Sequence, residues 1–87
     1  MNAVEIRVMN DTGLHARPAS QFVKISNRFR SEVSVIKDGR KVNAKSIMGL
    51  MSLAISKGTT IRIEAEGLDE QKVVEALVHF IEHELDN

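Results

Sequence analysis

Cysteine, tryptophan and tyrosine are absent from this sequence of 87 residues, and proline occurs only once. Without cysteine, the chain can form neither a disulfide framework nor a thiolate metal site. It also lacks an excess of either charge, because 12 lysines and arginines balance 12 aspartates and glutamates. This balance argues against a strongly basic nucleic-acid-binding protein and against a polybasic membrane anchor.

Long apolar runs are also missing, and none approaches the roughly 20 residues that a transmembrane helix needs. The first residues carry Glu5 and Arg7 within their apolar pattern, which is unlike the core of a signal peptide. These features favour a cytoplasmic protein with no membrane insertion. A chain of this length is expected to form a single domain, 1–87, with a small core.

Alternating apolar and polar residues predict four strands, each with one buried face. The dipeptide Asp38-Gly39 is typical of a two-residue hairpin turn, and it separates the second strand from a returning strand over 40–44. The apolar positions that define the strands are Val4, Ile6 and Val8, then Val33 and Val35, then Val42, and finally Ile61, Ile63 and Ala65.

Three helices are expected between and after these strands. The first begins near Pro18, because proline is tolerated in the first turn of a helix. Ser46 is a good N-cap for a second helix over 47–55, which Gly58 is placed to end. The expected inner face of the first helix comprises Ala16, Ala19, Phe22, Val23, Ser26 and Phe29.

A third helix is expected after Gly67. Asp69 is placed to cap it, and Leu68 and Val73 occupy the positions of a hydrophobic staple. Its buried stripe is predicted to contain Val73, Val74, Leu77, Phe80, Ile81 and Leu85.

The element order is therefore β-α-β-β-α-β-α. Strands with one apolar face need helices on that side only, which predicts a two-layer α+β open-faced sandwich. The pattern alone leaves the strand order open, and a ferredoxin-like order is as compatible with it as any other.

The octapeptide Gly13-Leu14-His15-Ala16-Arg17-Pro18-Ala19-Ser20 is the main candidate site, since it lies where an extended segment meets the first helix. Amides and the macrodipole at a helix N-terminus favour an anion. A neutral imidazole needs no separate base to act as a nucleophile near pH 7. We therefore expect His15 to accept and pass on a phosphoryl group. Arg17 is expected to stabilise it by charge-assisted hydrogen bonds, with support from Ala16 and Pro18.

The second motif is Lys45-Ser46-Ile47-Met48-Gly49-Leu50-Met51. Ser46 fits both a structural N-cap and a phosphorylation site, and the two roles are compatible. The apolar residues of so short a helix cannot all face the core, which predicts an adaptable contact surface. The residues expected to contact partners are Ile47, Met48, Met51, Leu14, Ser20 and Lys24, with Arg17, Arg28 and Lys45 as further candidates for a cationic rim.

A histidine pair lies on the last predicted helix. His79 and His83 are one turn apart, a spacing that can hold a metal ion. They fall on the polar side of that helix, and the sequence offers no cysteine and no clear third ligand. We expect a solvated face there, and neither a metal nor a cofactor.

Taken together, the two motifs and their spacing closely resemble the HPr family, the histidine phosphocarriers of the bacterial phosphoenolpyruvate:sugar phosphotransferase system. The resemblance implies an antiparallel strand order 1-4-2-3 in place of the ferredoxin-like order. It also implies that His15 takes a phosphoryl group from phosphorylated enzyme I and hands it to a histidine of a sugar-specific IIA domain. The chain would then be a covalent carrier and not an independent catalyst.

Around Ser46 the chain resembles the form found in Gram-positive bacteria. The resemblance implies phosphorylation of Ser46 by an ATP-dependent serine kinase/phosphorylase and a role as corepressor of a catabolite-control transcription factor. A paralogue in this family lacks the active histidine, so the presence of His15 favours the carrier. Ala54 replaces a glycine common in the family and is expected only to tighten the helix.

Two other functions remain open at this stage. One is a regulatory binding module that acts through Ser46 and the surface around Met48 without phosphoryl transfer. The other is a small-ligand sensor with a ferredoxin-like sheet, although the sequence has no glycine-rich phosphate loop to support it.

Overall fold

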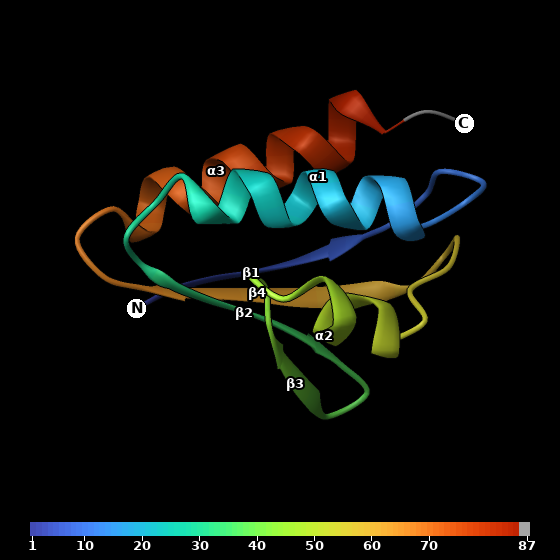
Figure 1. Ribbon diagram of the computed structural model, residues 1–87, viewed down its shortest axis with the longest axis horizontal. Coiled ribbons are helices and arrows are strands. Elements are labelled where there is room, and N and C mark those ends of the chain that lie inside the picture. The colour runs from blue at the N-terminus through green and yellow to red at the C-terminus, as the bar shows by residue number, and fades with distance from the viewer. Residues whose placement is uncertain (86–87) are drawn as a thin grey trace.

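The computed structural model describes residues 1–85, in which one four-stranded antiparallel sheet is combined with three α-helices (Figure 1). The strand order is β1-β4-β2-β3, which confirms the order implied by the family resemblance. The elements are β1 (Asn2–Arg7), α1 (Ala16–Asn27), β2 (Glu32–Lys37), β3 (Arg40–Asn43), α2 (Ile47–Ser52), β4 (Thr60–Glu66), α3 (Glu70–His79) and a π-helical segment, η1 (Phe80–Glu84).

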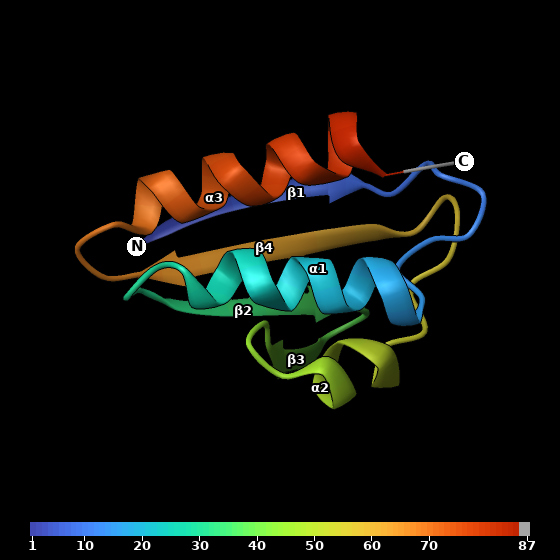
Figure 2. The ribbon, with the colours of Figure 1, turned by 45° about the horizontal axis from the view of Figure 1, so that its top comes forward.

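The helices form the second layer of the sandwich. Figures 1 and 2 show α1 and α3 side by side over the sheet, with α2 beside β3. The short α2 also packs against α1, so the two motifs of the sequence lie on neighbouring helices. Within residues 1–85, no helix is both long and apolar enough to cross a bilayer.

The central strand β4 follows the predicted alternation. Ile63 is buried and lies opposite Val35 of β2 in the antiparallel register. Its neighbours in sequence point to the other face, where the carboxylate of Glu64 lies 2.8 Å from Arg62 Nε and 3.3 Å from Lys41 Nζ. One face of the sheet therefore belongs to the core, and the other presents charged side chains.

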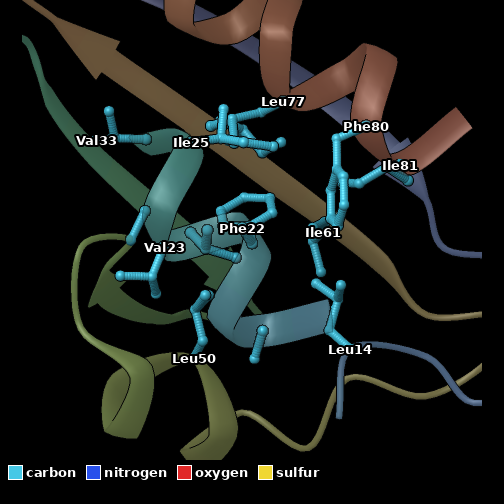
Figure 3. Packing of buried hydrophobic residues seen from close by; sticks show 14 of the residues in the cluster. Leu14, Phe22, Val23, Ile25, Val33, Leu50, Ile61, Leu77, Phe80 and Ile81 are labelled. Atoms are coloured by element: carbon cyan, nitrogen blue, oxygen red, sulfur yellow. The ribbon is translucent and has the colours of Figure 1, made fainter. Parts of the chain in front are cut away.

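The core joins the sheet to all three helices (Figure 3). Phe22 of α1 and Phe80 of η1 meet edge to face, with ring centroids 6.4 Å apart. Leu50 of α2 is fully buried in the same cluster. Burying side chains of this size stabilises the fold by about 1.5–3 kcal/mol each. Leu14 also belongs to the cluster, which ties the segment directly before His15 to the core.

Most of the helix predictions are confirmed. Pro18 lies in the first turn of α1, and the predicted inner face of α3 and η1 is buried, with Leu85 half-buried at its end. Ala16 is exposed, however, so its place on the inner face of α1 was wrong. Phe29 is half-buried beyond the end of that helix.

The end of α2 differs from the prediction. The helix stops at Ser52 instead of continuing to residue 55, and Ala54 adopts a left-handed conformation with φ of 51°. The expectation that Ala54 only tightens the helix was therefore wrong. Gly58 does not end α2, because it lies in the turn before β4, where its N–H donates to the Val8 carbonyl at 2.6 Å.

Two cations of the β2–β3 hairpin account for this early end. Lys37 Nζ donates to the carbonyls of Leu53 and Ala54, at 2.8 and 3.0 Å, and Arg40 donates to the carbonyl of Ser52 at 3.2 Å. These carbonyls are among the groups that a helix end leaves without intrahelical partners. Long-range contacts, which local sequence does not reveal, therefore fix where α2 stops.

The start of α3 also departs from the expected cap. Asp69 occupies the N-cap position, but its carboxylate accepts hydrogen bonds from the backbone N–H groups of Arg30 and Ser31, each at 2.9 Å, and from the Ser31 hydroxyl. These bonds, with the Ser31 hydroxyl foremost, lower the pKa of Asp69 to about 2. Leu68 is 96% exposed, so the staple with Val73 was wrong.

Candidate functional site

His15 is the N-cap residue of α1. Its backbone is extended, with φ of −81° and ψ of −168°, and its side chain makes no capping hydrogen bond. Its carbonyl accepts the Ala19 N–H at 2.7 Å, which closes the first turn. The imidazole is exposed, so it is accessible to solvent and does not contribute to capping the helix.

The segment before His15 is tightly packed. Gly13 has φ of 63°, and a Cβ at this position would lie 2.4 Å from the Ile55 carbonyl oxygen, so only glycine fits. The Leu14 N–H donates to the same oxygen at 3.0 Å. Because the Leu14 side chain is only 2% exposed, its predicted role in partner contact was wrong, and it anchors the segment instead.

A hollow of about 410 Å³ lies in front of His15. Arg17 and Pro18, two of the candidate site residues from the sequence, line it. Gln21 also lines it, and its position one turn after Arg17 could have indicated this. The complete lining is Thr12, His15, Ala16, Arg17, Pro18, Gln21, Glu84 and Leu85.

Two residues that line the hollow come from the C-terminal end of the described chain, at the end of η1 and directly after it. Glu84 and Leu85 lie almost seventy residues from His15 in sequence, and only the packing of α3 against α1 brings them there. The Glu84 carboxylate lies 3.3 Å from His79 Nε2. No local pattern in the sequence could have placed these residues at the site.

The start of α1 has the chemistry of an anion site. Its first turn contains no acidic residue, and its early amides have no acceptors within the helix. Arg17 is exposed and adds a guanidinium that can form bidentate, charge-assisted hydrogen bonds to phosphate oxygens. This arrangement can hold a phosphoryl group beside an accessible imidazole nitrogen.

Ser46 is a true N-cap, as predicted. Its hydroxyl accepts the Gly49 N–H at 3.0 Å, its carbonyl accepts the Leu50 N–H at 3.1 Å, and its own N–H donates to the Asn43 carbonyl at 3.1 Å. The residue is half-buried, so the hydroxyl lies close to the surface.

The residues after Ser46 form an exposed apolar surface. Met48 is 83% exposed, and Met51 and Ile47 are 44% and 41% exposed, whereas Leu50 is buried. We call Ile47, Met48 and Met51 the α2 surface. On the neighbouring α1, Lys24 is exposed and Ser20 is half-buried. The predicted contact residues Ile47, Met48, Met51 and Lys24 are therefore accessible and Ser20 is partly so, whereas Leu14 is not.

Of the four predicted rim cations, one is engaged in a hydrogen bond and another lines a different hollow. Lys45 Nζ donates to the Phe29 carbonyl at 2.9 Å. Arg28 lines a separate hollow between α1 and α3, together with His79. Lys24 and Arg17 remain as exposed cations on α1.

The histidine pair on the last helix is associated with glutamates. The rings of His79 and His83 lie 4.9 Å apart, and His83 Nε2 is 4.0 Å from Glu82. Among residues 1–85, no group of three or more histidine, aspartate or glutamate side chains is arranged to hold a metal ion.

Comparison with known proteins gives a consistent result. The family model described as "PTS HPr component phosphorylation site" matches residues 3–83. The chain is 60% identical to the HPr-like protein Crh of Halalkalibacterium halodurans over 92% of this chain and 95% of that protein. It is 47% identical to the phosphocarrier protein HPr of Neisseria meningitidis over 87% of this chain and 85% of that protein.

A solved structure extends the likeness to three dimensions. HPr-C-His from Thermoanaerobacter tengcongensis matches with a TM-score of 0.92 and 52% identity, over 94% of this chain and 92% of that one. The chain therefore belongs to the HPr family of the phosphotransferase system.

Proposed function

We propose that this protein is a phosphocarrier in which His15 accepts a phosphoryl group from phosphorylated enzyme I and passes it to a histidine of a sugar-specific IIA domain. The observation that carries the proposal is the exposed His15 side chain at the N-cap of α1, in one hollow with Arg17. Membership of the HPr family supports it, as does the likeness to the Neisseria phosphocarrier protein.

The step itself is a transfer between two nucleophiles. A neutral imidazole nitrogen attacks phosphorus, a nitrogen–phosphorus bond forms, and the bond from phosphorus to the donor breaks. The product carries close to two negative charges. Arg17, which lines the same hollow as His15, and the first-turn amides of α1 would stabilise this charge as it develops, which lowers the barrier. The same groups act in reverse when the phosphoryl group leaves.

Partners would dock on the α2 surface and the adjoining part of α1. Exposed methionine adapts to different partners, which suits a carrier that must meet a donor and several acceptors. Lys24, exposed on α1, would steer acidic partner surfaces toward the site. Ser20, half-buried on the same helix, would add a polar contact.

Incubation with phosphoenolpyruvate and enzyme I tests this function. We expect one phosphoryl group per chain that is labile in acid and stable in base, detected by intact-protein mass spectrometry. His15→Ala should remain unlabelled, and Ser46→Ala should be labelled like the wild type. An unlabelled wild type, or equal labelling of His15→Ala, would eliminate the carrier function.

We further propose that Ser46 is a regulatory phosphorylation site. An ATP-dependent serine kinase/phosphorylase would phosphorylate it, and the modified protein would act as corepressor of a catabolite-control transcription factor. Its hydroxyl is near the surface and borders the α2 surface, where a new charge would affect docking. Cell extract with ATP should add an acid-stable phosphate that Ser46→Ala lacks. Labelling that persists in Ser46→Ala would rule out this site.

A second candidate function is a regulatory binding module that acts through Ser46 and Met48 without phosphoryl transfer. This second candidate is supported by sequence identity, because the chain is 60% identical to an HPr-like protein Crh and 47% identical to the Neisseria phosphocarrier. It predicts phosphorylation by ATP and extract, but none by phosphoenolpyruvate and enzyme I. The two reactions run side by side therefore separate the candidates.

A further inference from the structure

The peptide group between Gly13 and Leu14, one residue before His15, is held at both of its ends by hydrogen bonds. The Gly13 carbonyl accepts a hydrogen bond from Asn10 Nδ2 at 2.9 Å, and the Leu14 N–H donates to the Ile55 carbonyl at 3.0 Å. The carbonyl and the N–H belong to the same planar unit, which rotates as a rigid body. Two hydrogen bonds at its opposite ends therefore fix its orientation.

Asn10 is placed to do this from inside the protein. Its side chain is buried, with the residue only 5% exposed, although asparagine is mostly found at the surface. In addition to its bond to the Gly13 carbonyl, Asn10 Nδ2 donates to Thr12 Oγ1 at 3.2 Å. The backbone carbonyl of Asn10 accepts the Gly13 N–H, also at 3.2 Å. Asn10 thus organises the turn that leads to the site, through its side chain and its backbone carbonyl.

On the other side of His15, the chain is held as well. The His15 carbonyl accepts the Ala19 N–H at 2.7 Å, so the chain is held both at the Gly13–Leu14 peptide group, one residue before His15, and at the His15 carbonyl, while the ring stays exposed. Hydrogen bonds on both sides of His15 therefore restrict how its backbone can move.

We propose that Asn10 is a positioning residue for phosphoryl transfer at His15. It touches no reacting atom and acts by fixing the Gly13–Leu14 peptide group, which aims the imidazole across the hollow that holds Arg17. The inference rests on the proposed phosphocarrier function. Loss of the Nδ2 donor lets this peptide group rotate, and small misplacements of a reacting group lower rates strongly.

The test uses Asn10→Ala, which removes the side-chain donor, and Asn10→Asp, which keeps the shape and loses the donor. Phosphorylation by enzyme I is measured with each variant as the varied substrate. We expect kcat to fall about tenfold while KM stays unchanged, because the residues that contact partners are untouched.

Ser26→Ala is the matched control. The Ser26 hydroxyl is equally buried and donates to the Phe22 carbonyl at 3.0 Å, away from residues 10–14. Its loss should lower Tm and leave kcat unchanged. If Ser26→Ala lowered kcat as much, or if both Asn10 variants retained the wild-type kcat, the inference would be overturned while the carrier function stood. An unlabelled wild type would overturn both.

Discussion

The starts of α1 and α2 use their N-cap residues in opposite ways. At α2, the Ser46 hydroxyl accepts the Gly49 N–H, and the side chain is part of the helix end. At α1, the His15 side chain makes no such bond and stays exposed over a hollow that also contains Arg17. The N-cap side chain thus stabilises the helix end at α2, whereas at α1 it leaves an imidazole accessible to solvent.

Under the proposed function, this difference separates the phosphoryl-transfer step from partner docking. Anion-binding features gather at α1, whereas the exposed apolar side chains Ile47, Met48 and Met51 gather at α2. A charge added at Ser46 should therefore alter docking, and a change at Arg17 should alter the transfer step. The variants below test that separation.

The largest effect is expected for Arg17→Ala. The initial rate of His15 phosphorylation by enzyme I should fall about 100-fold, because developing charge loses a fixed donor. Arg17→Lys should recover only part of this, since lysine lacks the planar fork. Arg28→Ala, another exposed arginine of the α1 region, is the control and should keep the rate within about twofold. Equal losses at both positions would mean that general positive charge, and not the site, is responsible.

A smaller effect is expected for Ser46→Asp. Phosphorylation at His15 should slow about tenfold through repulsion at the docking surface. Far-UV circular dichroism should be nearly unchanged, because aspartate also caps helices. Ser46→Ala separates charge from capping, since it should lose about 1 kcal/mol of stability and keep the wild-type rate. A large loss of helicity in Ser46→Asp would contradict a purely electrostatic effect.

Ala54→Gly should stabilise the protein. A left-handed backbone costs a residue with a Cβ about 1 kcal/mol or more, and glycine avoids that cost. The expected rise in Tm is about 4–8 °C per kcal/mol for a chain of this size. Ala76→Gly, in the middle of α3, should change Tm in the opposite direction. If Ala54→Gly also lowered Tm, the end of α2 would not be strained.

The smallest effect is expected at Asp69, whose carboxylate is partly exposed. Its pKa is about 2 in the folded protein against an ordinary value of 3.8, so its stabilisation is present above about pH 4 and is lost as the pH falls toward 2. Asp69→Asn should lower Tm at pH 7 and differ little from the wild type near pH 2. A constant difference in Tm across this range would contradict the role of the charge. The pKa values of Glu64 and Glu70 are also lowered, and these residues contribute equally to the pH dependence of the wild type and of Asp69→Asn.

Sequence patterns predicted the parts of the fold that depend on neighbours in the chain. Alternation placed Ile61 and Ile63 on the inner face, the Asp38-Gly39 turn joined β2 to β3, and Ser46 capped α2. Strand order came from family resemblance, because periodicity says nothing about which strands pair.

Features that depend on distant residues could not be predicted in this way. Lys37 and Arg40 set the end of α2 from another hairpin, and Asp69 binds the turn at Ser31 instead of its own helix. At the site, His15 and Arg17 were found from a local motif. Leu14 was misjudged, and Glu84 was missed, because burial and long-range packing decide both.

Onward transfer tests the carrier role most directly. The protein is labelled at His15 by enzyme I and radioactive phosphoenolpyruvate, separated from the enzyme, and mixed with an unphosphorylated IIA domain. We predict that the label moves to the IIA domain and that adding enzyme I with pyruvate draws it back. Label that stays on the protein, or that appears only as inorganic phosphate, would contradict a role in which His15 holds the group briefly and passes it on.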